Sequence, residues 1–107
     1  MKTLFILNDD PYSGERTYSG LRVANAISRR EVNSVRVFFL ADSVPSARRI
    51  RQVPQAAYTV EEMLGICGAC MNTRKLGDGD IVEGAHRSTL ADLSEWTEWA
   101  DKVLVFD

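Results

Sequence analysis

Residues 3–8 read TLFILN, a short and uninterrupted apolar run that stops at the polar sequence NDDPYSG. A strand with one face in water alternates apolar and polar residues, whereas a strand of a parallel sheet is buried on both faces and is apolar throughout. The run therefore predicts a strand of a parallel sheet. The Asp-Pro and Ser-Gly pairs that follow are turn signals, and they predict where this strand ends.

Two further segments extend the strand into a β-α-β unit. Residues 16–30 predict an amphipathic helix, because apolar side chains recur about one helical turn apart. These side chains are Tyr18, Leu21, Ala24 and Ile27. Residues 34–42, SVRVFFLAD, are rich in β-branched and aromatic residues and predict a second strand. The helix has the length that a right-handed crossover between parallel strands needs.

The remainder of the chain predicts more helices and a last strand. We expect helical segments over residues 43–52, 59–65, 71–77 and 88–102, a loop or very short strand over residues 80–86, and a final buried strand over residues 102–106. Two residue pairs have the spacing of a capping box at a helix start: Thr59 with Glu62, and Thr89 with Asp92. Glycines at positions 65 and 77 are the expected helix stops. Strands that alternate with helices predict an α/β fold whose mainly parallel sheet is covered on both faces.

Length and composition limit the classes of protein to consider. The 107 residues, 45% hydrophobic and 26% charged, suffice for one domain over residues 1–107 with one core. The net charge of −2 does not favour nucleic acid or a membrane surface as a partner. The apolar run near the start is too short for a signal peptide, and no stretch approaches the ~18 residues of a membrane span. We therefore expect a cytoplasmic protein whose thiols are kept reduced.

Both cysteines lie in ICGACMNTRKLG, residues 66–77, with C-x-x-C spacing. A disulfide here would close a very small loop, and a reducing compartment opposes it. A structural zinc site usually needs four ligands, but the chain has one histidine, His86, so a carboxylate or a partner subunit would have to contribute. Inert cysteines that pack as small apolar residues are a third interpretation. All three stay open beside a reactive thiol.

The neighbourhood of the cysteines favours the reactive thiol. If a helix begins at the motif, Cys67 and Cys70 lie near its N-terminus, and Arg74 follows one turn after Cys70. A helix N-terminus and a nearby arginine both lower a thiol pKa. A thioredoxin fold is disfavoured, because it needs a proline loop after the C-x-x-C and every proline of this chain precedes it.

Other motifs give weaker signals. The chain lacks G-x-G-x-x-G and Walker A sequences. Asp9 and Asp10 follow the first strand, where α/β proteins often bind ligands, but they equally suit a turn and a helix cap. Glu15 and Arg16 suit an exposed ion pair or the same site. Further residues with structural interpretations are His86 with Arg87 and Ser88, as loop or capping residues, and Trp96 with Trp99, as core or subunit interface.

Several stretches together resemble the DsrE/DsrF-like family of small α/β proteins, which includes YchN-like proteins and subunits of sulfur relays. The matching stretches are LNDDPYSGERTYSGLRVA, VRVFFLAD, EEML, CGACMNTRKL, IVEGAHRSTLADLSEW and WADKVLVF, in family order. The resemblance implies a three-layer, doubly wound, mainly parallel sheet of four to five strands with helices on both faces. It also implies trimers or hexamers, and a cysteine at a strand end that accepts persulfide sulfur.

The spacing to the following arginine maps that acceptor onto Cys67, and Cys70 is then a second thiol that resolves a persulfide as a disulfide. One departure from the family pattern matters. Family members have a longer helix and a strand before the cysteines, whereas here EEMLG runs directly into ICGAC, so about ten residues are missing. A strand is then absent or is formed by residues 64–67, and we expect a four-stranded sheet with a poorly anchored cysteine loop, or another segment in the gap. Lys75 also replaces a glycine that often follows the arginine.

The resulting hypothesis is a sulfur carrier or sulfurtransferase-like protein in which Cys67 accepts sulfur and Arg74 stabilises the sulfur anion. Thiolate attack on a persulfide needs neither a metal nor an organic cofactor. The expected partners are sulfur donor and acceptor proteins and further copies of the chain. The residues expected to line the same cleft are Asp10, Tyr12, Glu15 and Arg16. Two other classes stay open, namely a non-catalytic oligomeric interaction subunit with inert cysteines and a metal-binding module.

Overall fold

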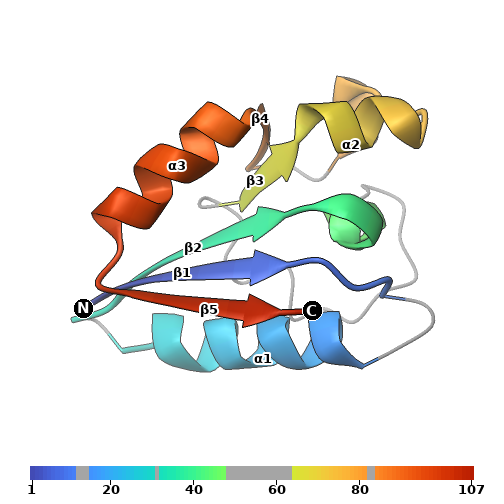
Figure 1. The fold of residues 1–107 in the computed structure, drawn as a ribbon. Helices are drawn as coiled ribbons and strands as arrows, with labels where there is room; N and C mark the ends of the chain where they lie inside the picture. Colours follow the sequence, from blue (N-terminus) through green and yellow to red (C-terminus); the bar gives the residue numbers. More distant parts are fainter. Residues whose placement is uncertain (12–14, 31, 48–63, 82–83) are drawn as a thin grey trace.

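The computed structural model describes residues 1–11, 15–30, 32–47, 64–81 and 84–107. The strands in these ranges are β1 (Lys2–Leu7), β2 (Ser34–Phe39), β3 (Leu64–Cys67), β4 (Ala85–Ser88) and β5 (Lys102–Phe106). They form one sheet in the order β4-β3-β2-β1-β5, and all neighbours are parallel. The chain winds outward from β1 to one edge and returns with β5 on the other side of β1, so the sheet is doubly wound (Figure 1).

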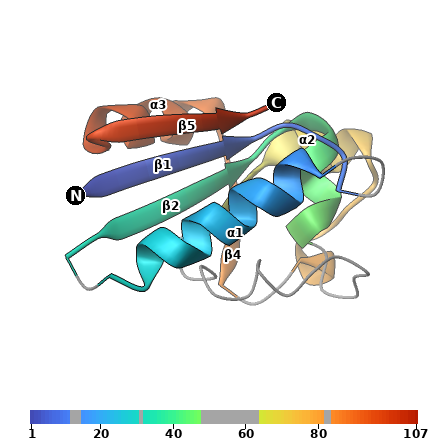
Figure 2. The same cartoon turned by 90° about the horizontal axis from the view of Figure 1, so that it is seen from below.

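Helices cover both faces of this sheet. The helical elements are α1 (Arg16–Ser28), the 3₁₀ segments η1 (Ala41–Ala47) and η3 (Asp78–Asp80), α2 (Gly68–Thr73) and α3 (Leu90–Trp99). Helices α1 and α3 lie on opposite sides of the strands (Figures 1 and 2). The predicted class of a mainly parallel, three-layer α/β fold is therefore confirmed. No helix in the described ranges is long and apolar enough to span a membrane.

Alternate side chains of the strands build two apolar clusters. Residues such as Phe5, Val37 and Ile66 pack with α1, η1 and α2 in the larger cluster. Leu4, Phe38 and Cys67 pack with Leu93 and Trp96 of α3 in the smaller one. Apart from Thr3 and Gly65, the buried residues of the central strands β1, β2 and β3 are apolar, as strands buried on both faces require. The sheet thus places Cys67 on the α3 face and its neighbour Ile66 on the other.

The expectation of a four-stranded sheet with a poorly anchored cysteine loop is wrong. Leu64–Cys67 forms β3, and this short strand pairs with β2 on one side and with β4 on the other. Gly65, expected to stop a helix, lies in the middle of this strand. Its lack of a side chain admits Phe38 and Trp96, whose atoms lie 2.9 and 3.0 Å from where a Cβ would stand. The capping pair Thr59–Glu62 lies outside the described residues.

Other element boundaries also need correction. Residues 80–86 were expected to form a loop or a very short strand and residue 88 to begin a helix, whereas residues 85–88 form β4, whose edge position tolerates the polar sequence AHRS. The expected helix over residues 43–52 is a 3₁₀ segment as far as it is described. Helix α2 begins at Gly68 and ends near Lys75, which has a left-handed φ of 58°, rather than at Gly77. The last strand, expected to be buried, is an edge strand with an exposed Val105.

Candidate functional site

Cys67 occupies the junction between a strand and a helix. It is the last residue of β3 and the N-cap residue of α2, with extended backbone angles (φ −58°, ψ 115°). In the neighbouring strand it pairs with Ser88, the last residue of β4. The carboxyl ends of parallel strands, where α/β proteins commonly bind ligands, therefore meet at Cys67.

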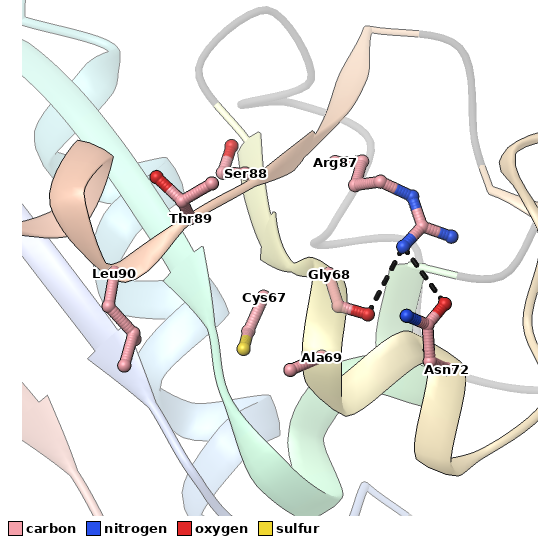
Figure 3. Close-up of a pocket in the computed structure, with 8 residues that line it drawn as sticks. All are labelled: Cys67, Gly68, Ala69, Asn72, Arg87, Ser88, Thr89 and Leu90. Carbon is pink, nitrogen blue, oxygen red and sulfur yellow. Dashed lines mark hydrogen bonds between the residues drawn. The ribbon is translucent and has the colours of Figure 1, made fainter.

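A pocket of about 460 Å³ opens at this junction (Figure 3). Its walls come from the start of α2, the end of β4 and the start of α3. The lining residues are Cys67, Gly68, Ala69, Asn72, Arg87, Ser88, Thr89 and Leu90. Cys67 is a free cysteine, and the residue lines this pocket with 5% of its surface exposed.

The residue that begins α3 is held by a complete capping box. The Thr89 hydroxyl accepts a hydrogen bond from the Asp92 backbone N–H, and the Thr89 N–H donates to the Asp92 carboxylate. The capping pair expected from the sequence is thus confirmed. It fixes one wall of the pocket, because Thr89 and the next residue, Leu90, both line it.

Cys70 lies in the first turn of α2 and has different surroundings. Its sulfur accepts a hydrogen bond from the backbone N–H of Ala41 at 3.3 Å. Burial raises the pKa of the Cys70 thiol above its ordinary value, and a hydrogen bond with the Cys67 side chain raises it further. The Ala41 N–H and the charge of Arg74 lower this pKa, but burial outweighs them. The expected lowering of the thiol pKa at the helix start is therefore wrong for Cys70.

Arg74 lies beside the second cysteine and is not among the lining residues of the pocket. Its guanidinium donates to the Cys70 carbonyl at 3.1 Å and forms an ion pair with Asp42 at 2.7 Å. These contacts tie the end of α2 to η1. The structure therefore brings Arg74 to the backbone of Cys70, and its charge acts on the Cys70 thiol.

Arg87 is the pocket residue that sequence reasoning missed. It lies in β4 and donates to the Gly68 carbonyl at 3.2 Å and to the Asn72 side-chain oxygen at 3.0 Å (Figure 3). It is the charged residue among those that line the pocket. Its place in the sheet would have identified Arg87. If AHRS is a parallel strand beside LGIC, the carboxyl end of AHRS lies next to Cys67.

Three of the four residues expected in the same cleft, Asp10, Glu15 and Arg16, are not among the described residues that line the pocket. Asp10, Glu15 and Arg16 follow β1, which is separated from β3 by β2 in the sheet. Glu15 is the N-cap residue of α1, and Arg16 donates to the Asp107 carbonyl at 2.6 Å, beyond β5. Tyr12 lies outside the described residues. Within the described ranges, no group of three or more His, Cys, Asp or Glu side chains has an arrangement suited to a metal ion.

Comparisons with known proteins relate the whole chain to one family. A family model described as the DsrE/DsrF-like family matches residues 1–106. Protein YchN of Escherichia coli (strain K12) is 32% identical over 116 residues, which cover 98% of each chain. The protein MJ0989 of Methanocaldococcus jannaschii, described as uncharacterized, is 31% identical over 115 residues, which cover 99% of this chain and 100% of that one. Both alignments are longer than the 107 residues of this chain, so they contain gaps here.

Solved structures give the same relationship. The crystal structure of the YchN protein from Escherichia coli superposes with a TM-score of 0.83 and 27% identity over 99% of both chains. A protein of unknown function, MTH1491 from Methanobacterium thermoautotrophicum, superposes with a TM-score of 0.68 at 18% identity, and this likeness concerns the fold alone. The chain therefore has the fold of the YchN protein over 99% of its length.

Proposed function

Because the chain belongs to the DsrE/DsrF-like family, we propose that it is a sulfur carrier that accepts persulfide sulfur on Cys67 and passes it to a partner protein. The family indicates a role related to sulfur relay. The observation that carries the finer proposal is the position of Cys67, a free thiol at the carboxyl end of a parallel strand on the wall of a pocket. A buried cysteine that served only as packing would not need this opening.

The chemistry is an exchange of one sulfur–sulfur bond for another. The Cys67 thiolate attacks the outer sulfur of a donor persulfide, R–S–SH, so that a new S–S bond forms at Cys67 and the donor S–S bond breaks. The donor leaves as the thiolate R–S⁻, and Cys67 carries S–SH. Attack by an acceptor thiolate on this outer sulfur then regenerates the Cys67 thiolate. No net oxidation or reduction occurs, so no redox cofactor takes part.

Cys70 supports Cys67 in two ways in this proposal. Its protonated thiol is a hydrogen-bond donor for the neighbouring sulfur, and the raised Cys70 pKa keeps it protonated near neutral pH. When Cys70 does lose its proton, its thiolate attacks the inner sulfur of the Cys67 persulfide, forms a Cys67–Cys70 disulfide and releases HS⁻. Arg74 acts through Cys70, since it binds the carbonyl of that residue.

The partners that fit this function are a sulfur donor protein, a sulfur acceptor protein and further copies of this chain in a trimer or hexamer. A reducing compartment such as the cytoplasm suits free thiols. Exposed apolar side chains are available for such contacts: Leu90 lines the pocket, and Val103 and Val105 lie on β5 at the opposite edge of the sheet. The competing classes predict different behaviour, because inert cysteines would not take up sulfur and a metal-binding module would purify with metal.

The test is a mass measurement on the reduced protein after incubation with a persulfide donor. We expect a gain of about 32 Da per chain, one sulfur atom, located on Cys67 by peptide mapping. Cys67→Ser is expected to abolish the adduct. Cys70→Ser removes the thiol that resolves the persulfide, so the adduct should persist longer than in the unaltered protein. No adduct, or one that survives Cys67→Ser, would contradict the proposal.

A further inference from the structure

One side chain crosses from the edge strand to the residues that follow Cys67. Arg87 lies in β4 opposite Ile66 of β3, and its side chain reaches over to α2. Nη1 donates to the Gly68 carbonyl at 3.2 Å and to the Asn72 Oδ1 at 3.0 Å, as Figure 3 shows. The same nitrogen thus holds the first turn of α2 at two points.

Gly68 is shaped for this contact. A Cβ at position 68 would stand 3.1 Å from the Arg87 Cγ and 3.2 Å from its Nη1. Contacts this short force the neighbour to move, and here the neighbour is the arginine side chain that holds the turn. A side chain at position 68 would therefore push Arg87 a few tenths of an ångström away from the backbone that it contacts.

Arg87 also forms an ion pair, through Nε, with Asp78 at 2.7 Å. The Asp78 side chain is 76% exposed, and ion pairs of this kind contribute little stability in water. The contacts with Gly68 and Asn72 are the ones that reach the cysteine turn. Substitution of Asp78 therefore removes only the exposed ion pair of Arg87, whereas substitution of Asn72 removes a contact with α2.

We propose that Arg87 is a positioning residue for Cys67, which it holds at the pocket through the Gly68 carbonyl and the Asn72 side chain. The inference rests on the proposed function only in taking Cys67 as the reacting thiol. Strand β3 has only four residues, which pair with β2 and β4, and Cys67 is the last of them, at the point where the chain leaves the sheet. Arg87 supplies an anchor from the neighbouring strand, at the peptide group that directly follows the cysteine.

The test compares sulfur uptake on Cys67 over a range of donor persulfide concentrations. For Arg87→Gln we expect the saturating rate to fall about tenfold while the half-saturating concentration changes little, because misplacement affects the reaction more than encounter. Asn72→Leu should act in the same direction, and Asn72→Asp, which keeps an acceptor oxygen, should retain more of the rate than Asn72→Leu. Asp78→Asn, which removes the exposed ion pair alone, should leave the rate unchanged.

A second measurement does not depend on sulfur chemistry. Hydrogen exchange of the backbone amides of residues 68–71 should accelerate in Arg87→Gln and stay unchanged in Asp78→Asn, at matched global stability. Gly68→Ala should also accelerate exchange relative to the unaltered protein. Added to Arg87→Ala, the same substitution should cause a much smaller further increase, because the side chain that it would clash with is absent.

The outcomes separate the two proposals. An unaltered uptake rate in Arg87→Gln, or an equal loss in Asp78→Asn, overturns the positioning role. If the unaltered protein takes up no sulfur, the proposed function fails, and amide exchange alone then decides whether Arg87 holds the turn. Unchanged amide exchange in Arg87→Gln would overturn the proposal that Arg87 holds the turn.

Discussion

The backbone N–H of Ala41 donates a hydrogen bond to the sulfur of Cys70 across 3.3 Å. This contact joins η1 to α2. The two cysteines therefore have different surroundings, because Cys70 is hydrogen-bonded to η1 whereas Cys67 lines the pocket. Ala41 itself has a left-handed φ of 49°, a conformation that costs roughly 1–2 kcal/mol for a residue with a side chain. The pair therefore links a strained turn to the second cysteine.

The raised pKa of Cys70 predicts a pH-dependent reaction. In the unaltered chain, alkylation of Cys70, followed by peptide mapping, should reach half of its maximal rate at a pH above the ordinary thiol value of about 8.5, because burial and the hydrogen bond with Cys67 disfavour the thiolate. The same protein unfolded in denaturant serves as control and should react at the ordinary value. Arg74→Gln should move the midpoint further up, since it removes a charge that favours the thiolate. Equal midpoints for folded and unfolded protein would contradict the prediction.

The same shift affects stability. The folded protein holds the Cys70 proton more tightly than the unfolded chain does, so this contribution to the free energy of unfolding is fully present below the ordinary thiol pKa. It is lost as the pH rises through the raised folded-state pKa. Cys70→Ser should remove this part of the pH dependence, which denaturant unfolding at several pH values will measure.

Gly65→Ala should destabilise the protein. The added methyl group would meet the Phe38 ring at 2.9 Å and the Trp96 ring at 3.0 Å, and overpacking of this kind costs about 1–3 kcal/mol. Gly79→Ala is the matched control, because no atom lies within 4 Å of its added Cβ and little change is expected. Urea unfolding will compare the two free energies of unfolding. Equal effects would show that β3 does not pack against α3 as described.

Lys75→Gly should stabilise the protein. Lys75 has a φ of 58°, and a glycine adopts this conformation without the steric cost that a Cβ imposes, a difference of about 0.5–1 kcal/mol after the greater freedom of the unfolded glycine is included. Lys75→Ala keeps the Cβ and should bring no such gain. The thermal midpoints of the two variants will show the difference, and a gain for alanine equal to that for glycine would refute this explanation.

Val105→Glu should dissociate the trimer or hexamer expected from the family resemblance. The Val105 side chain is 55% exposed on the edge strand β5, and an apolar side chain at such an edge gains by contact with another copy. Val32→Glu is the control, because Val32 is 82% exposed but precedes β2 at the opposite end of the strands. Sedimentation velocity will give the masses. Identical masses for both variants and the unaltered chain would place any interface elsewhere.

The elements that were predicted well carry their signal within a few residues. The apolar run of β1, the helical spacing of α1 and the capping box of Thr89 and Asp92 are local patterns, and the structure reproduces them. Strand β4 was predicted only in part, as a loop or a very short strand over residues 80–86, because AHRS has no apolar run. An edge strand of four residues is held by hydrogen bonds to its neighbour rather than by burial of its side chains, and a sequence pattern does not record that partner.

The sequence by itself determined the α/β class, the family resemblance and Cys67 as the thiol of interest. Only the tertiary structure decided how Cys67 is anchored and what surrounds it. The pairing of β3 with β4 brings Arg87 to Gly68, although 19 residues separate them along the chain. The periodicity of apolar residues indicates which side of a segment faces the core and which faces solvent. Which strands become neighbours in the sheet depends on the packing of the whole chain.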